Sequence, residues 1–367
     1  MTRVLGIMSG TSIDAVDYAL CEVDARRIVL RKHWQAAFPA TLRRRLHDAA
    51  ANRSTTYELG QLHHDLGRFY AEHGRRSGAP RPEIAGLHGQ TVFHDADRGA
   101  TLQIGEPSWL ARKLGVPVVS NFRAADLAAG GQGAPLATMF HARAFAERGK
   151  HICVNNLGGI SNVTSLDWRD GSSPRIIAFD TGPANMLIDL AVDRATKGRR
   201  RFDRNGAIAR RGTLDEQLLM RLVKHKFFKV KPPKSTGREV FGDAFFERIT
   251  KHAPRIRSSD LVTTLTEFTA RSLALNYFLH LPSTPDCVIL CGGGAANPAL
   301  VAAIRANLSA EVVECDSLGW PAQAIEPAAF ALLAWLRVAG KPGNIPETTG
   351  ASHAVLLGQI TSPWARV

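Results

Sequence analysis

Apolar residues along the chain gather in short runs, which predict strands, and in longer stretches with helical spacing, which predict helices. The expected strands are residues 4–7, 16–23, 84–87, 116–119, 151–155, 160–166, 175–179 and 288–290. The expected helices are residues 57–73, 137–147, 184–191, 214–224, 261–279, 298–308 and 327–338. The two kinds of element alternate, so an α/β fold follows. We interpret residues 226–242 as a loop and 341–350 as a Pro/Gly-rich surface segment, and we expect a capping box of Thr213 and Glu216 before the helix at 214–224.

One local pattern occurs twice. Residues 4–7 and 16–23 are apolar runs joined by the turn 9–12, and residues 151–155 and 160–166 are joined by Gly158 and Gly159. Each copy reads as a hairpin with small residues at its tip. The copies lie about half a chain apart, and 367 residues exceed the usual size of a single core. We therefore expect two related domains, residues 1–135, completed by part of the C-terminal segment, and residues 136–367.

The formal net charge of +13 suggests nucleic-acid binding at first sight. The basic residues form no long tract, however, and no zinc-finger spacing or aromatic-basic RNA signature accompanies them. A solvated, Arg-rich surface that attracts small anions is the better interpretation, with no nucleic-acid partner.

The five cysteines are odd in number and include no CxxC pair, and most lie in apolar runs, which favours a reducing compartment. The N-terminal apolar run is too short for a signal peptide, and no stretch is long enough to span a bilayer. We expect a cytoplasmic protein without a membrane partner.

Glycine-rich turns follow strands at Ser9-Gly10-Thr11, at Gly158-Gly159 and at Gly292-Gly293-Gly294. Bare backbone at such turns can approach phosphate oxygens closely, and three turns together favour a nucleotide site. The sequence lacks GxxxxGK[ST], which excludes a P-loop NTPase, and it lacks a dinucleotide fingerprint after a strand. Asp14 and Asp17 could hold Mg²⁺ through water, although an Asx-rich turn would read the same way.

Asp180 ends a predicted strand and is followed by Thr181, Gly182 and Pro183. A carboxylate in this position can face a crevice and act as a general base. From local sequence alone, an N-cap for the helix at 184–191 is the better interpretation.

Several strings occur in an order that resembles the anhydro-N-acetylmuramic acid kinase family. They are GIMSGTSID (6–14), HGQT (88–91), LQIG (102–105), NFR (121–123), AGGQGAP (129–135), NLGGISN (156–162 with Asn156 first), FDTGP (179–183), PKSTGRE (233–239), CGGG (291–294) and Glu326. The match extends over about residues 4–335.

The resemblance implies two ribonuclease-H-like domains, as in actin-like ATPases, flanking an ATP cleft. It implies a reaction in which 1,6-anhydro-N-acetylmuramic acid, ATP and water give N-acetylmuramic acid 6-phosphate and ADP, in peptidoglycan recycling and amino-sugar catabolism. Asp180 would take a proton from the water that attacks the anomeric carbon. The 6-oxygen released from the anhydro bridge would then attack the γ-phosphate. A homodimer is the form suggested by the family.

The same resemblance places the remaining site residues. Those expected to contact ATP·Mg²⁺ are Ser9, Gly10, Thr11, Ser12, Ile13, Asp14, Ala15, Val16, Asp17, Asn156, Gly158, Gly159, Gly292, Gly293 and Gly294. Those expected to contact the sugar are His88, Gln90, Arg123 and Glu326. Arg123 suits the lactyl carboxylate of this sugar, or else forms a structural ion pair with Asp126. His88 either contacts substrate or is a buried structural histidine. Lys234 and Arg238 could close over a ligand or be loop surface charge.

Two positions depart from the family pattern. Ala15 and Ala184 stand where glycine is usual, and Ala15 would be strained by about 1 kcal/mol if its backbone were left-handed. A levoglucosan-type kinase, which needs no carboxylate-binding group, and an inactive ATP-binding module are the alternative functions.

Overall fold

The computed structural model describes residues 1–10 and 12–363, which form two compact units. The first unit comprises Met1–Ala144 and Gln323–Val367, and the second comprises Phe145–Ala322. The observed boundaries differ from the division expected at residue 135. Residues 136–144 belong to the first unit rather than the second. Part of the C-terminal segment was expected in the first domain, and the unit includes the chain from Gln323 onward, whose long helix packs on the first sheet.

The sheet of the first unit has the strand order β12-β6-β4-β1-β2-β3, with β5 paired to β4. Its strands are β1 (Thr2–Ser9), β2 (Ala15–Val23), β3 (Ile28–Ala37), β4 (Ile84–Asp95), β5 (Ala100–Ile104), β6 (Val118–Ser120) and β12 (Gln359–Thr361). β1 and β2 form the expected antiparallel hairpin, whereas β1, β4 and β6 run parallel.

Helices cover both faces of this sheet, and the alternation of side chains along β1 decides which face each helix meets. Leu5 and Ile7 join one core with α1, α2 and α3, while Gly6 between them faces α12. The helices of this unit are α1 (Ala40–Ala50), α2 (Thr56–His73), α3 (Pro107–Leu114), α4 (Ala124–Ala128), α5 (Thr138–Phe145), α12 (Ile325–Val338) and α13 (Pro346–Thr349).

The sheet of the second unit has the order β11-β10-β7-β8-β9. Its strands are β7 (His151–Leu157), β8 (Ile160–Asp167), β9 (Arg175–Pro183), β10 (Cys287–Cys291) and β11 (Glu311–Glu314). The first three strands are antiparallel, and β7, β10 and β11 run parallel. The first sheet has this same order and direction in β6-β4-β1-β2-β3. The duplicated hairpin therefore marks a duplicated sheet, and the α/β fold with two ribonuclease-H-like domains is confirmed.

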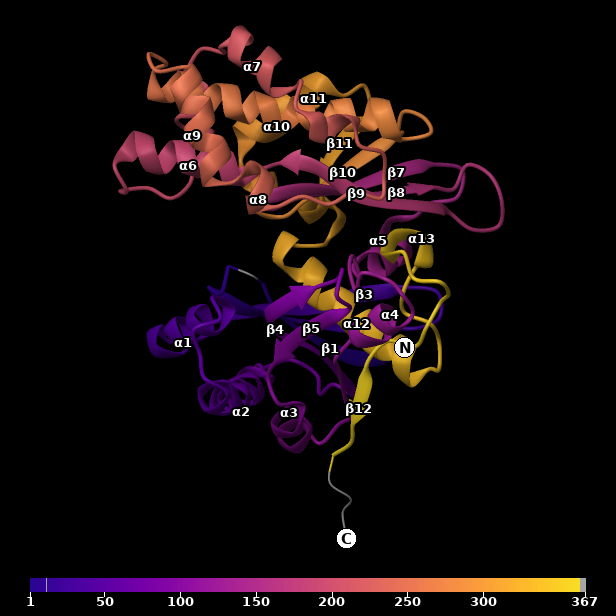
Figure 1. Cartoon of the computed structure of the whole chain (residues 1–367). Coiled ribbons are helices and arrows are strands. Elements are labelled where there is room, and N and C mark those ends of the chain that lie inside the picture. The colour runs from indigo at the N-terminus through magenta and orange to yellow at the C-terminus, as the bar shows by residue number, and fades with distance from the viewer. Residues whose placement is uncertain (11, 364–367) are drawn as a thin grey trace. The chain divides into compact units, whose positions relative to one another are not determined.

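Helices α10 and α11 pack together over one face of the second sheet (Figure 1). The helices of this unit are α6 (Asn185–Thr196), α7 (Glu216–Leu222), α8 (Arg238–Phe241), α9 (Asp243–His252), α10 (Ser258–His280) and α11 (Pro298–Asn307). Short 3₁₀ turns occur at η1 (Arg204–Gly206), η2 (Ala209–Arg211), η3 (Lys226–Lys229), η4 (Gly293–Ala296), η5 (Cys315–Leu318) and η6 (Ala322–Ala324).

Three local predictions were wrong. The N-cap of α7 is Asp215, whose side chain accepts from the Leu218 N–H, so Thr213 and Glu216 form no capping box there. Residues 226–242 contain η3 and α8 rather than loop alone. The segment 341–350 is not merely a surface segment, because Asn344 and Thr349 are buried and donate hydrogen bonds to Asp126.

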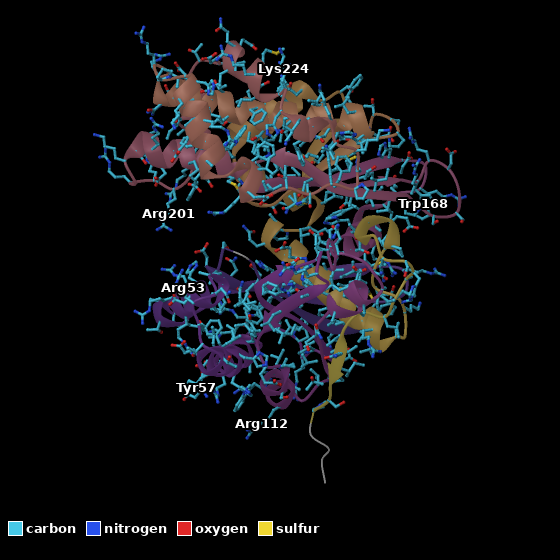
Figure 2. The ribbon with its side chains drawn as sticks, in the orientation of Figure 1. Arg53, Tyr57, Arg112, Trp168, Arg201 and Lys224 are labelled. Atoms are coloured by element: carbon cyan, nitrogen blue, oxygen red, sulfur yellow. The ribbon has the colours of Figure 1, made fainter. Side chains whose placement is uncertain are left out.

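The exposed basic side chains are distributed over separate elements. Arg53 precedes α2, Arg112 lies on α3, Arg201 follows α6 and Lys224 follows α7, and all four point outward from the ribbon (Figure 2). This arrangement matches the solvated surface charge expected from the sequence. No helix in the described part of the chain is long and apolar enough to cross a membrane.

Candidate active site

The tip of the first hairpin is built by hydrogen bonds between backbone and buried polar groups. The Ile13 N–H donates to the Gly10 carbonyl (3.2 Å), and the Gln90 amide donates to the same oxygen (3.2 Å). Ser9 is buried, with its hydroxyl 3.0 Å from that of Tyr70, so it supports the tip rather than facing outward. Thr11 lies outside the described residues.

Two carboxylates follow the turn of this hairpin, Asp14 just before β2 and Asp17 within it. Asp14 is exposed, as is Ser12, while Asp17 accepts from Gln35 Nε2 (2.7 Å) and lies 3.1 Å from His33 Nε2. Both contacts fall on Oδ1 of Asp17. The described residues contain no cluster of three or more His, Cys, Asp or Glu that could hold a metal. Mg²⁺ takes few carboxylates and keeps several waters, so this donor set still fits it.

Ala15 carries no left-handed strain. It opens β2 and pairs with Ala37, so its backbone is extended, and Val16 beside it is buried. Among the described residues of the turn, the left-handed one is Ile13, with φ 56°, and its side chain is buried. The glycine usual at position 15 is therefore not needed for the backbone path seen here.

The tip of the second hairpin is docked on the start of α6. The N–H groups of Ala184 and Met186 donate to the Gly159 carbonyl (2.9 and 3.1 Å), and the Asn185 N–H donates to the Gly158 carbonyl (3.0 Å). The first N–H groups of the helix are thus satisfied by the turn itself. This pairing fixes the tip and the helix as one rigid element.

A cavity of about 290 Å³ lies beside this tip, lined by Gly159, Met186, Asp189, Leu190, Asp193, Arg201, Arg238 and Asp243. Burial raises the pKa of Asp189 to about 7. The second hairpin therefore borders a space with both acidic and basic walls.

The glycines of the three turns are of two kinds, those whose surroundings leave room for a Cβ and those whose surroundings do not. A Cβ on Gly10 would have only the Ser12 hydroxyl 4.0 Å away, and one on Gly293 would meet nothing within 4 Å. A Cβ on Gly158 or Gly159 would make at closest a 3.4 Å contact. By contrast, Gly292 has φ 78°, and Gly294 would place a Cβ 2.7 Å from Leu157. Gly292 and Gly294 are thus required by the fold beside Asn156 and Leu157, whereas a Cβ on Gly10, Gly158 or Gly159 would meet no clash, so glycine at the tips leaves the backbone bare without a steric need.

Asp180 lies in β9 next to a bulge. Asn162 pairs with Asp180, and Ser161 pairs with Gly182, so Thr181 is the extra residue. The Thr181 hydroxyl is buried and donates to the Ser161 hydroxyl (2.7 Å). Bulges bend a strand and change the direction of neighbouring side chains. Phe179 joins the core under α10, so the Asp180 side chain leaves from the opposite face of the strand.

The Asp180 carboxylate is held by the segment that follows η3. The Thr236 N–H donates to Oδ2 (2.8 Å), and the Asp180 N–H donates to the Lys234 carbonyl (3.0 Å). The helix after β9 begins at Asn185, with Ala184 as N-cap and no side-chain cap. The N-cap interpretation of Asp180 is therefore wrong, because β9 continues to Pro183 and keeps Asp180 away from the helix start.

Burial raises the pKa of Asp180 to about 6, with a smaller rise from Glu239, whereas the Thr236 N–H and Lys234 lower it. At neutral pH the group is mostly ionised and can accept a proton, with a basicity above that of an ordinary aspartate.

His88 and Arg123 form a buried pair with a defined protonation state. Nε2 of His88 lies 2.9 Å from Nη2 and 3.3 Å from Nε of Arg123, while Nδ1 lies 2.8 Å from the Gly89 carbonyl. An arginine only donates, so Nε2 carries the lone pair and Nδ1–H donates to Gly89. Burial and the Arg123 charge hold the pKa of His88 well below its usual range. His88 is therefore a neutral support for Arg123.

Arg123 keeps part of its donor capacity. Nη1 donates to the Gly133 carbonyl (2.7 Å), and Nε and Nη2 donate to His88. Each terminal nitrogen thus retains one N–H without a partner among the described residues, which suits a carboxylate. The alternative ion pair with Asp126 is wrong: that carboxylate is buried and accepts from the Gly133 N–H (2.7 Å), Asn344 and Thr349.

Glu326 lies in the first turn of α12 and is exposed. Desolvation by surrounding protein raises the pKa of its carboxyl, Asp17 raises it further, and Arg123 lowers it. Water still reaches the side chain, which weakens the desolvation. Glu326, Arg123 and Asp17 are therefore electrostatic neighbours within the first unit.

Gln90 is buried with an acceptor left over. Its Nε2 donates to the Gly10 and Thr91 carbonyls, and Oε1 has no hydrogen-bond partner in the described structure. Gln90 thus links β4 to the first tip and leaves one polar atom for a ligand or water.

Comparison with known proteins decides the family. Residues 2–363 match the family model described as anhydro-N-acetylmuramic acid kinase. The chain belongs to the anhydro-N-acetylmuramic acid kinase family. It is 40% identical over 382 residues to the kinase of that name from Picosynechococcus sp., covering 99% of this chain and all of the relative. It is 42% identical over 376 residues to that of Gloeobacter violaceus, covering 98% of each. As a member of the anhydro-N-acetylmuramic acid kinase family, the chain is an enzyme, a phosphotransferase.

Two partners of Asp180 were not anticipated. Lys234 and Thr236 belong to the string PKSTGRE (233–239), but nothing in local sequence connects that string to β9. Lys234 is buried rather than an exposed loop charge, whereas Arg238 is exposed.

Proposed function

We propose that the chain uses ATP and water to convert 1,6-anhydro-N-acetylmuramic acid into N-acetylmuramic acid 6-phosphate and ADP, with Asp180 as the general base. The observation that carries this proposal is the half-buried Asp180 carboxylate, with Oδ2 held by the Thr236 N–H and a pKa raised to about 6. Oδ1 remains available for a water proton.

In the proposed reaction, water gives a proton to Asp180 while its oxygen bonds to the anomeric carbon. The bond from that carbon to the 6-oxygen breaks, the 6-oxygen attacks the γ-phosphorus, and ADP leaves. The sugar has no free 6-hydroxyl before the bridge opens, so hydrolysis must accompany transfer. Positioning of water and of an in-line phosphate provides most of the acceleration in such a step.

The bare backbone at Gly10 and at Gly158-Gly159 supports phosphate binding at both hairpin tips. Asp14 and Asp17 are the residues that would hold Mg²⁺, which neutralises phosphate charge. The two remaining N–H groups of Arg123 support recognition of the lactyl carboxylate, and Glu326 beside it would contact the sugar. A cytoplasmic location and a homodimer belong to the same proposal by analogy with the family.

The deciding experiment is Asp180→Asn, assayed by coupled ADP release. Asn keeps the shape and an oxygen acceptor for Thr236 but cannot take the proton. We expect kcat to fall roughly 100- to 10,000-fold with ATP affinity nearly unchanged. The free energy of unfolding should not fall, because the pKa of Asp180 is raised on folding, so its ionised form costs stability above about pH 6.

Parallel assays with levoglucosan define the substrate. Preference for the lactyl sugar supports the proposal, and equal turnover of levoglucosan would favour the neutral-sugar alternative. Turnover of Asp180→Asn within a few-fold of the parent would reject the mechanism, and a parent that releases no ADP from either sugar would indicate an inactive module.

A further inference from the structure

The segment between η3 and α8 runs beside the end of β9. The Asp180 N–H donates to the Lys234 carbonyl (3.0 Å), and the Thr236 N–H donates to the Asp180 carboxylate (2.8 Å). Two backbone groups of this segment, two residues apart, thus hold the main chain and the side chain of Asp180. The orientation of the carboxylate therefore depends on what fixes residues 234–236.

The Lys234 side chain is the buried anchor of that segment. Only 9% of Lys234 is exposed, and Nζ donates to the Phe227 carbonyl (3.3 Å). The same nitrogen lies 4.6 Å from the centre of the Phe227 ring and 5.8 Å from that of Phe179. No carboxylate in the described part of the chain forms an ion pair with it. Burying an ammonium without a paired anion costs free energy, which a merely structural position could avoid with an apolar side chain.

His280, at the end of α10, is the remaining neighbour of Nζ. Its Nε2 lies 3.1 Å from Lys234 Nζ and 2.8 Å from the Phe228 carbonyl. A single ring nitrogen can donate to the carbonyl or accept from the ammonium, but it cannot do both. The carbonyl of Phe227 and the two rings are therefore the constant partners of the ammonium.

We propose that Lys234 is a positioning residue for Asp180: its side chain fixes residues 234–236, whose backbone orients the carboxylate, and its ammonium favours the ionised base. This inference rests on the proposed role of Asp180. It adds a residue that acts through residues 234–236 and sets the geometry and the charge state of the base.

The charges around the two groups make the proposal testable by pH. Lys234 lowers the pKa of Asp180, whereas burial and Glu239 raise it. Burial lowers the pKa of Lys234 to about 8, and Asp180 opposes that change. Burial also lowers the pKa of His280, as does the Lys234 charge. Lys234 is therefore mostly charged at neutral pH, where Asp180 must be ionised.

The experiment compares Lys234→Met with Lys231→Met in the full chain. Lys231 is exposed on the same segment, so its variant removes the same charge without touching the anchor. Coupled ADP release is measured from about pH 5 to 9 with saturating ATP. Loss of the Lys234 charge should move the acid limb of kcat/KM to higher pH, giving on the order of a tenfold loss at the acid end. It should also lower kcat at every pH, with KM for ATP unchanged, and Lys231→Met should match the parent.

A uniform fall in kcat with an unmoved acid limb would make Lys234 structural only and would overturn the inference. So would a parental profile for Lys234→Met. If circular dichroism shows that Lys234→Met does not fold, the Lys234→Arg variant is used instead. A lowered kcat with the acid limb of kcat/KM at the same pH as in the parent supports the inference. An acid limb at a different pH, or a kcat equal to that of the parent, overturns it. Failure of the mechanism itself is separate, because it would appear as an active Asp180→Asn enzyme.

Discussion

Individual polar residues in this protein are held by partners that leave one side of each group unused. The Thr236 N–H occupies Oδ2 of Asp180, and His88 with Gly133 occupies three of the five N–H groups of Arg123. Gln90 likewise donates from its amide nitrogen to two carbonyls, while its buried Oε1 has no hydrogen-bond partner among the described residues. Groups that are already fixed and still have an unused hydrogen-bonding atom are pre-organised for a ligand, because binding need not first order them.

Arg123 gives a prediction about substrate choice. Arg123→Lys keeps the charge but not the paired N–H groups that suit a carboxylate. We expect kcat/KM for the lactyl sugar to fall on the order of 10- to 100-fold, with a much smaller change for a neutral anhydrosugar. Arg123→Ala should lower kcat/KM for the lactyl sugar further, again with a much smaller change for the neutral anhydrosugar.

The control for this prediction is thermal unfolding. Arg123→Ala leaves the buried Nε2 of His88 without its donor, which costs roughly 1–3 kcal/mol of stability. Equal losses on both sugars, together with such destabilisation, would assign Arg123 to the fold and remove its role in recognition.

At the scale of elements, the two copies of the hairpin are held in place by different neighbours. The first tip is held from β4 by Gln90, and the second is held by the N–H groups that open α6. Both tips carry glycine where the surroundings do not demand it. Glycine kept without a steric need points to a ligand that approaches the backbone closely.

Gly10 and Gly6, which lie close together in sequence, allow the ligand role of glycine to be tested apart from its packing role. Gly10 lies outside the left-handed region and faces open space, whereas a Cβ on Gly6 would overlap the Pro327 carbonyl of α12. Gly10→Ala should keep the melting temperature of the parent and raise KM for ATP roughly tenfold or more, because the methyl group keeps phosphate away from the backbone. Gly6→Ala should lower stability by about 1–3 kcal/mol or more.

Calorimetric melting with ATP titration distinguishes the two glycine variants. A Gly10→Ala enzyme with parental ATP affinity would show that the first tip does not contact phosphate. A Gly6→Ala protein as stable as the parent would show that α12 can move away from β1 at little cost.

At the scale of the whole molecule, the first unit is made from both ends of the chain. The chain leaves it at Ala144 and returns at Gln323, and α12 then packs on β1, β2 and β4. Gly6 and Gly86 allow this approach, because a Cβ on either would meet the backbone of α12. Glu326, in the first turn of that helix, comes beside Arg123 and Asp17 only through this return.

A chain ending at Ala322 tests this arrangement. It lacks α12 and β12, so one face of the first sheet would lose its cover, and we expect the first unit not to fold. Hydrogen exchange should show protected amides in β7–β10 and rapid exchange in β1, β2 and β4. Native-like protection of β1 in the shortened chain would contradict the packing described here.

Local chemistry made much of this predictable from sequence. Apolar runs and turn residues are short-range signals, because a strand or helix must bury its apolar face. They predicted the hairpins, the α/β class and a helix at 57–73, which is observed as α2. The strand β3 was missed, since Arg31, Lys32 and His33 interrupt its apolar pattern, and only pairing with β2 makes it a strand. Motif order gave the family and most candidate residues.

Tertiary structure alone decided the roles that depend on distant partners. Whether Asp180 caps a helix or is held as a free carboxylate depends on Thr236, 56 residues away along the chain. Whether Arg123 pairs with Asp126 or keeps N–H groups depends on Asn344 and Thr349, more than 200 residues distant, which occupy that carboxylate. Sequence specifies which groups can donate, accept or ionise, but hydrogen bonds and desolvation act only over a few ångströms. The fold therefore determines which of these groups meet.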